Sequence, residues 1–252
     1  MKLNKSVKLY KVLRGGGNSC HGGNCVWSLP DGDTPGKWMP KINDKLVVCK
    51  NGYHLITRNF LIDWINLGVY EAECKGKTLL SGDKIVTKKV RLLRRVGLLD
   101  KRLVRLFTYD CVDRILPMFE NENPYDKILR KAIETARLYA DGKATEKEII
   151  MVREEAENIL LACTTDTRTK YAITAVISAT LLYDNPKNLN VLLCELDFVA
   201  YIAKSVANSA RISKAHAMME QGIKCNTTYI SERAWQSDKL FEYLEVGNKL
   251  YS

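Results

Sequence analysis

Residues 49–76, CKNGYHLITRNFLIDWINLGVYEAECKG, decide the fold of the first half of this 252-residue chain. Gly52 favours a tight turn, because glycine adopts backbone conformations that other residues avoid. The turn presents Tyr53 and His54, and a histidine titrates near neutral pH, which suits acid–base or hydrogen-bonding roles. We therefore treat both as candidate ligand-binding residues. The alternative is that the His54 ring only satisfies nearby backbone groups.

The rest of this segment predicts a helix and then a strand. Apolar residues within 60–67 form one face at helical spacing, and either Thr57 or Asn59 is placed to cap that helix. The alternating pattern of residues 69–74 predicts a strand. A turn, a helix and a strand are thus expected in direct succession.

Residues on either side of this segment continue the strand pattern. Short alternating runs predict further strands at 8–14, 45–49 and 84–96. Stretches rich in Gly, Pro, Asn and Asp predict connecting loops at 15–24, 29–38 and 75–84. The first half is therefore expected to be a mixed α/β domain.

The second half has helical periodicity. Pro124 is a helix-start signal, and Thr145 with Glu148 forms a capping box for the next helix. Further helices are expected near 170–183, over 188–221 with an internal break, and from a cap at Ser231. We predict an α+β protein: a basic α+β domain over residues 1–97, a helical connector over 98–122 and an all-α bundle or array over 123–252.

The composition indicates a soluble globular protein. No apolar run approaches the ~18–20 residues that cross a bilayer, and the basic N-terminus lacks an apolar signal core. We expect a cytoplasmic location, and the host cytoplasm if a phage encodes the chain. The eight scattered cysteines are then expected to be free thiols rather than a disulfide framework.

All the excess positive charge of the chain lies in its first half. Residues 1–120 carry 22 Lys and Arg against 11 Asp and Glu, whereas residues 121–252 carry 17 against 18. The densest basic stretch follows residue 87 and suits binding of nucleic acid or another polyanion. Its candidate residues are Lys88, Lys89, Arg91, Arg94, Arg95 and Arg102. The alternative is a solvated face that balances the mildly acidic bundle.

Two further patterns near the turn have chemical meaning. Cys20, Cys25, Cys49 and His54 have the residue types and pair spacing of a zinc site, although no CxxC pair is present, which favours independent thiols. Glycines at 15–17 and 22–23 suit a loop around an anion, and they make Gly16 and Gly22 candidate ligand-binding residues. We expect no cofactor, and zinc or NAD are the alternatives that these residues leave open.

The first half resembles an uncharacterised domain of phage and prophage proteins. The hallmark of that family is a Cys-x-x-Gly-aromatic-His turn, matched by residues 49–54, and a helix, a strand and a basic strand follow it. The second half looks like the Ala-rich helical tails often attached to this domain, with Glu232–Leu244 as the terminal motif. The resemblance implies a phage-type origin and this architecture, but no activity.

A second, weaker similarity concerns the fold alone. The order of strand, Gly-aromatic-His turn, helix, strand and basic strand looks like the core of ADP-ribosyltransferases. It implies a nucleotide of the NAD type held by Gly16, Gly22, Tyr53 and His54. The Glu-x-Glu of residues 71–73 does not complete this likeness, because the catalytic glutamate of those enzymes belongs to a later strand or loop.

No complete catalytic set is visible in the sequence, so whether the chain is an enzyme stays open. The charge asymmetry and the helical second half favour a non-enzymatic accessory or host-interaction protein that binds a protein or nucleic-acid partner. An ADP-ribosyltransferase-like nucleotide-binding enzyme, intact or degenerate, is the alternative.

Overall fold

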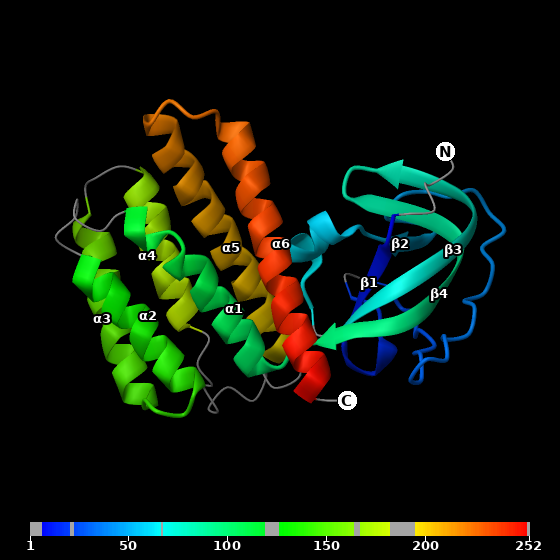
Figure 1. Ribbon diagram of the computed structural model, residues 1–252, viewed down its shortest axis with the longest axis horizontal. Helices are drawn as coiled ribbons and strands as arrows, with labels where there is room; N and C mark the ends of the chain where they lie inside the picture. The colour runs from blue at the N-terminus through cyan, green and yellow to red at the C-terminus, as the bar shows by residue number, and fades with distance from the viewer. Residues whose placement is uncertain are drawn as a thin grey trace. The chain divides into compact units, whose positions relative to one another are not determined.

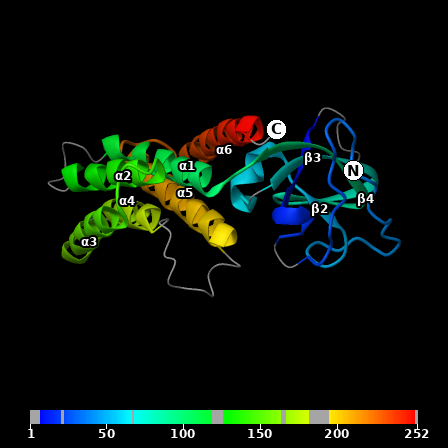
Figure 2. The same cartoon turned by 90° about the horizontal axis from the view of Figure 1, so that it is seen from below.

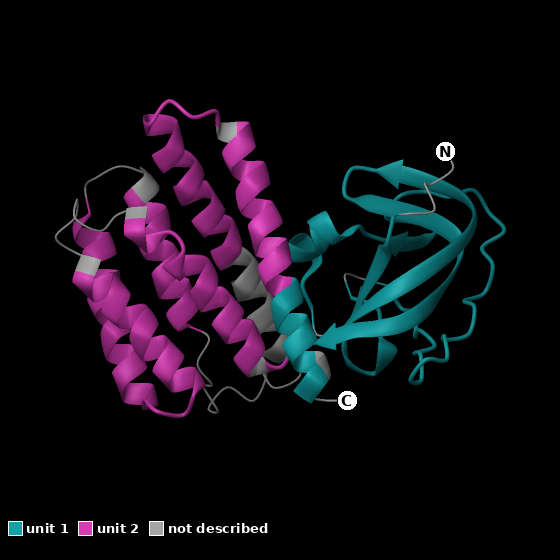
Figure 3. Ribbon diagram, viewed as in Figure 1, with its two compact units in different colours: residues 1–99, 241–252 teal, residues 100–240 magenta. Residues whose placement is uncertain are grey.

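The computed structural model describes residues 7–20, 23–66, 68–118, 126–163, 167–181 and 195–250 (Figure 1). The chain forms two compact units, one of residues 1–99 with 241–252 and the other of residues 100–240 (Figure 3). The first contains the strands and the second contains helices, so the predicted α+β class is confirmed.

The first unit is built on a four-stranded sheet. Its strands are β1 (Leu9–Leu13), β2 (Tyr53–Leu55), β3 (Gly68–Ser81) and β4 (Lys84–Leu98). All neighbours are antiparallel, in the order β1-β3-β4-β2. The two long strands therefore form the centre of the sheet, and the two short ones pair with their outer edges.

β3 and β4 form one long hairpin that corrects a sequence expectation. The loop predicted at 75–84 is wrong, because residues 78–81 continue β3 and pair with 84–87 of β4. Only Gly82 and Asp83 make the turn, and Gly82 has the positive φ of +56° that glycine accepts without strain. Three register shifts interrupt the ladder. Such bulges bend a strand and increase its twist.

The strand predicted at 45–49 is also wrong. The N–H groups of Lys50 and Asn51 both donate to the Val47 carbonyl, at 3.1 and 2.8 Å, so the chain turns there. The edge of β4 is instead occupied by an irregular segment, residues 36–42. Its backbone N–H groups donate to β4 carbonyls in the pairs Gly36–Leu92, Met39–Val90 and Ile42–Lys88, each at 2.9 Å.

The helix predicted over 60–67 is a shorter 3-10 helix, η2 (Arg58–Trp64). Thr57 takes the N-cap position, but its side chain makes no capping hydrogen bond. The chain has only a few residues here before β3 begins at Gly68, and short connectors of this kind commonly adopt the tighter 3-10 form.

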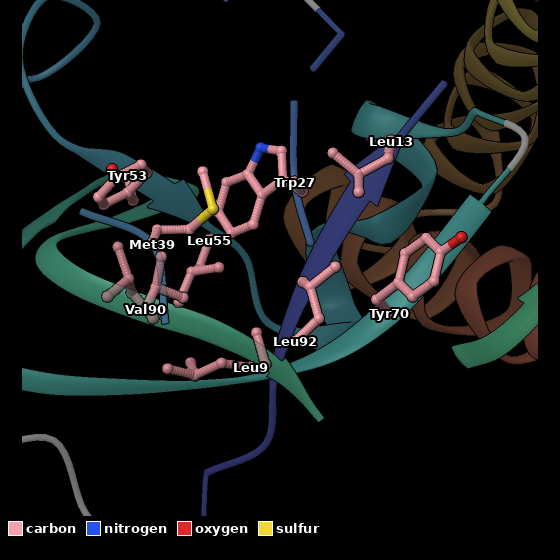
Figure 4. Packing of buried hydrophobic residues seen from close by; sticks show 11 residues of the cluster. Leu9, Leu13, Trp27, Met39, Tyr53, Leu55, Tyr70, Val90 and Leu92 are labelled. Atoms are coloured by element: carbon pink, nitrogen blue, oxygen red, sulfur yellow. The ribbon is translucent and has the colours of Figure 1, made fainter. Parts of the chain in front are cut away.

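Loop residues complete the core of the first unit (Figure 4). Trp27 and Met39, which belong to no strand, are buried among side chains of all four strands. The strand members of this cluster are Leu9, Leu13, Tyr53, Leu55, Tyr70, Ala72, Ile85, Val90 and Leu92. The long connection between β1 and β2 is thus anchored on the sheet by buried apolar side chains.

The last residues of the chain return to the first unit. The Phe241 ring lies edge-on to the Tyr10 ring, with 5.4 Å between centroids, and under the Arg58 guanidinium at 4.2 Å. At Gly97 a Cβ atom would collide with the Leu244 carbonyl. Glycine at this position of β4 therefore permits a close backbone approach.

The second unit is a set of helices that lie side by side (Figures 1 and 2). Its elements are α1 (Lys101–Asp113), η3 (Leu116–Met118), α2 (Asp126–Ala140), α3 (Glu146–Ala162), α4 (Thr167–Thr180), α5 (Glu195–Glu220) and the first part of α6 (Cys225–Leu250). α1, which lies in the segment expected to connect two domains, packs against α2, α4 and α5.

Local helix signals are only partly confirmed. The capping box is present, since Glu148 N–H donates to Thr145 Oγ1 at 3.3 Å and Thr145 N–H donates to Glu148 Oε2 at 2.7 Å. The cap predicted at Ser231 is wrong: α6 begins at Cys225, and the Ser231 hydroxyl donates to the Thr228 carbonyl inside the helix. The predicted break in 188–221 is absent from the described part, residues 195–220, which form one helix.

A buried carboxylate joins three helices of the second unit. Glu232 of α6 is fully buried, and its Oε2 accepts from Arg114 Nε at 2.9 Å and from Lys214 Nζ at 2.6 Å. Its Oε1 has no hydrogen-bond partner among the described residues. A buried charge is tolerated only when it is paired, so these contacts tie the end of α1, α5 and α6 to one another.

We expect Glu232→Gln to destabilise the protein by about 3 kcal/mol, because it leaves two cations without their buried counter-charge. Urea unfolding followed by helical circular dichroism measures this change. The matched control is Glu155→Gln, which breaks the exposed ion pair of Glu155 with Lys131 and should cost less than about 0.5 kcal/mol. Equal effects of the two substitutions would contradict this account.

Candidate functional site

A cavity of about 520 Å³ lies in the first unit beside the predicted turn. Its walls come from β1, from the loop after β1 and from residues 49–54, and Trp64 of η2 and Lys84 of β4 also line it. Its volume falls within the range of ~300–1,000 Å³ typical of small-molecule sites. The turn that the sequence indicated therefore borders a cavity of this size.

Gly52 and Tyr53 shape one side of the cavity. Gly52 has a φ of +143°, and a Cβ atom there would collide with Val86 Cγ1, so only glycine fits without strain. Tyr53 is buried, its hydroxyl donates to the Pro40 carbonyl at 2.8 Å, and its ring is 5.5 Å from the Trp27 ring. Tyr53 is thus a core residue as well as part of the cavity wall.

The His54 ring accepts a backbone hydrogen bond. The Cys49 N–H donates to His54 Nε2 at 2.9 Å, so the neutral ring carries its proton on Nδ1. Burial lowers the pKa of His54, and the nearby Lys11 and Lys84 ammonium groups lower it further. The bond also restrains Cys49, whose φ of +60° is unusual for a residue other than glycine.

Two lysines lie over tryptophan rings on the cavity wall. Lys11 Nζ is 4.9 Å from the Trp27 ring centroid and donates to the His54 carbonyl at 3.3 Å. Lys84 Nζ is 4.7 Å from the Trp64 ring centroid and 3.5 Å from Cys49 Sγ. Burial lowers the pKa of Lys11. Neither lysine could be predicted as a site residue from the sequence, because only the pairing of β1, β3 and β4 brings them to one cavity.

The four residues proposed as zinc ligands all line this cavity, but they are not gathered for a metal. Cys20 is buried and its thiol donates to the Val12 carbonyl at 3.2 Å, whereas Cys25 and Cys49 are exposed. Within the described residues, no three His, Cys, Asp or Glu side chains are grouped as a metal site requires. His54 Nε2 is already occupied by the Cys49 N–H. Zinc binding stays a prediction, and the arrangement of these four residues gives it no support.

The glycine candidates contribute less than expected. Gly16 lies in η1 (Gly15–Gly17) with a φ of +68° and does not line the cavity. Gly22 lies outside the described residues. Gly23 is the member of the glycine-rich loop that lines the cavity.

The strand glutamates are neutralised by basic residues of β4. Glu73 pairs with Arg91 at 2.8 Å, and Glu71 pairs with Arg94 at 2.8 Å. These cross-strand pairs support the interpretation of both glutamates as strand residues. They also reduce the net positive charge that Arg91 and Arg94 offer to a polyanion.

The six basic candidates have different surroundings. Lys88 Nζ donates to the Asn43 carbonyl at 2.8 Å, and Arg95 is half-buried on β4. Arg102 belongs to the second unit, where it pairs with Asp141 at 2.7 Å. Lys89 and Arg91 remain together on the hairpin.

Trp38 lies among the basic residues of the hairpin. The centroid of its ring is 4.5 Å from Lys75 Nζ, 5.4 Å from Lys89 Nζ and 4.8 Å from the Arg91 guanidinium carbon. Trp38 is half-buried and sits in the segment 36–42 that bonds to the edge of β4. Trp38 is not among the residues predicted from the sequence, where its signal is a lone tryptophan in a polar, Gly- and Pro-rich loop.

Comparison with known proteins gives a match that covers mainly the helical unit. Residues 94–179 match the family model described as "Imm-5 like putative immunity protein". The match covers about a third of the chain, from the end of β4 to nearly the end of α4. No curated protein and no solved structure matches the chain. The resemblance of the 49–54 turn to phage proteins lies outside the matched residues and stays a prediction.

The described helices include none that is long and apolar enough to cross a membrane.

The geometry of His54 predicts a pH dependence of stability. Because the folded state lowers the pKa of His54 below the ~6.5 of an unfolded histidine, the unfolded chain binds this proton more readily. Stability from His54 is then fully present above pH ~6.5 and is lost as the pH falls through the folded-state pKa. We expect the urea midpoint to decrease as the pH is lowered from about 7.5 to 5.5.

His54→Gln should flatten this decrease, because the substituted side chain does not take up a proton. His216→Gln in the second unit serves as the control and should leave the decrease in place. A decrease that persists unchanged in His54→Gln would show that another group causes it.

Proposed function

We propose that this chain is an immunity protein that binds a protein toxin and blocks it without catalysis. The match of residues 94–179 to an immunity-protein family model carries this proposal. The matched residues include α1, α2 and α3 and most of α4, so the helical unit is the proposed toxin-binding part. Of the two partners expected from the sequence, a protein or a nucleic acid, we therefore propose the protein.

One face of α3 has the chemistry of a protein-binding surface. Met151 and Leu161 are 51% and 85% exposed, and Lys147, Glu154 and Asn158 continue the same stripe at spacings of three and four residues. We call these five residues the α3 stripe. Large exposed apolar side chains rimmed by polar ones are typical of protein interaction sites.

The charge of α3 favours a basic partner. The helix contains five glutamates against one lysine and one arginine. Complementary charge steers two proteins together and disfavours wrong partners. The proposed partner is therefore a toxin domain that offers a basic surface with apolar pockets for Met151 and Leu161.

Competition between cells tests this function. Cells that lack this chain should be outcompeted in mixed culture by otherwise identical cells that carry it, because the latter are protected from the toxin that the strain produces. Expression of the chain from a plasmid should restore an equal ratio. The culture must be one in which the parent strain inhibits a toxin-sensitive strain, so that the toxin is known to be active. If the deletion strain competes equally with its parent there, the proposal fails.

The double substitution Met151→Glu with Leu161→Glu should remove the protection while the circular dichroism spectrum stays unchanged. Ile230→Glu is the matched control, since Ile230 is 70% exposed on α6 and lies outside the matched residues. Full protection by the double variant would exclude the α3 stripe as the toxin-binding surface.

A second candidate function is binding of single-stranded nucleic acid by the β3–β4 hairpin. The observation that favours it is Trp38 beside Lys75, Lys89 and Arg91, because single-strand binders combine aromatic rings with basic side chains. The Arg91–Glu73 ion pair weighs against it.

We expect Trp38→Ala to weaken binding of a fluorescent deoxythymidine oligonucleotide roughly 5- to 150-fold, since one stacked base contributes ~1–3 kcal/mol. Fluorescence anisotropy at increasing salt measures the affinity and its salt slope. Lys143→Ala, an exposed lysine of the helical unit, should have no effect. Absence of binding at low salt, or equal binding by Trp38→Ala, would rule this candidate out.

A further inference from the structure

The charges on the wall of the 520 Å³ cavity all have one sign. Among the described residues that line it, the ionisable ones, thiols and tyrosines aside, are Lys11, Lys50, Lys84 and His54, and none is Asp or Glu. Within the described residues, none of these lysines forms an ion pair with a carboxylate. The contacts of Lys11 and Lys84 are to a carbonyl, a thiol and two aromatic rings.

The positive charges of these lysines are not balanced by a carboxylate among the described residues that line the cavity. Ammonium groups in a partly desolvated hollow repel one another and gain energy from an anion between them. Burial lowers the pKa of both Lys11 and His54, and the nearby Lys11 and Lys84 lower that of His54 further. Elsewhere in this unit the sequence does supply acids, since Arg91 and Arg94 are each paired with a glutamate.

The cavity also offers flat apolar surface. Trp27, Tyr53 and Trp64 line it together with Ile42 and Ile56. Trp64 is half-buried, and its indole N–H is held by Asp83 at 2.7 Å, which fixes the orientation of the ring beside Lys84. Aromatic walls with a few placed charges are the usual composition of sites for small molecules.

We propose that this cavity binds a small phosphate monoester that also carries a planar ring. The phosphate contacts Lys11 and Lys84, and the ring lies against the aromatic side chains of the wall. A phosphate is favoured over a carboxylate because its charge near neutral pH approaches two, which compensates two lysines where a carboxylate compensates one. This site is independent of the proposed toxin-binding function, which rests on the other unit.

Isothermal titration of the 252-residue protein with AMP tests the proposal, since AMP joins a phosphate monoester to a planar base. We expect saturable binding at millimolar concentrations or below, with quenching of tryptophan fluorescence. Adenosine, which lacks the phosphate, and ribose 5-phosphate, which lacks the ring, should each bind at least tenfold more weakly. Absence of AMP binding overturns the proposal, and equal binding of indole-3-acetate overturns the preference for phosphate.

Charge-removing variants locate the site. Lys11→Met and Lys84→Met keep the length of the side chain, and each should weaken AMP binding by roughly tenfold or more, because a hydrogen bond to a charged group contributes ~1.5–3 kcal/mol. Lys77→Met, an exposed lysine of β3 that does not line the cavity, should bind AMP as the unmodified protein does. The two cavity variants are independent, so misfolding of one leaves the other as the test.

An unchanged affinity in either folded cavity variant overturns the assignment of the site. A loss of AMP binding that leaves protection in the competition assay intact would support the independence of the two functions.

Discussion

The antiparallel ladder between β3 and β4 is the constraint on which the first unit depends. Both long strands form hydrogen bonds with further segments along their outer edges. β1 pairs with β3, while β2 and the segment 36–42 bond to β4. Unpaired strand edges invite association with other chains. The β4 edge is occupied over residues 85–92, whereas β1 pairs with residues 68–72 of β3 only. Because β1, β2 and β4 supply Lys11, His54 and Lys84, the same ladder also fixes the walls of the cavity.

Some short-range features of this protein could be predicted from the sequence, although the cap predicted at Ser231 was wrong, and long-range ones could not. The Thr145–Glu148 capping box and the Gly52 turn depend on a few consecutive residues, so their patterns were sufficient. The loop predicted at 75–84 failed because its glycines and polar residues are weak strand formers that the facing β4 residues nevertheless hold in register. Strand preference depends more on the partner strand than on the residues themselves.

The same difference between short-range and long-range features is found at the candidate site. Tyr53 and His54 were predicted to lie at a hollow because the turn itself signals it, whereas Trp64, Lys11 and Lys84 reach that hollow only through tertiary pairing. The excess basic charge of residues 1–120 was visible, but its distribution was not. The structure uses it in three ways: cross-strand ion pairs with glutamates, contacts around Trp38, and the uncompensated lysines of the cavity.

Because the chain returns to its first unit, the gene cannot be divided into two domains at a single point. Residues 241–252 belong with residues 1–99, so in topology the helical unit is an insertion into the sheet unit rather than a domain appended to it. A fragment that ends at residue 99 would lack the Phe241 ring that contacts Tyr10 and Arg58, and would expose the backbone of Gly97 where Leu244 approaches. Evolutionary or engineered exchange of the helical unit therefore requires two junctions, one near residue 100 and one near residue 240.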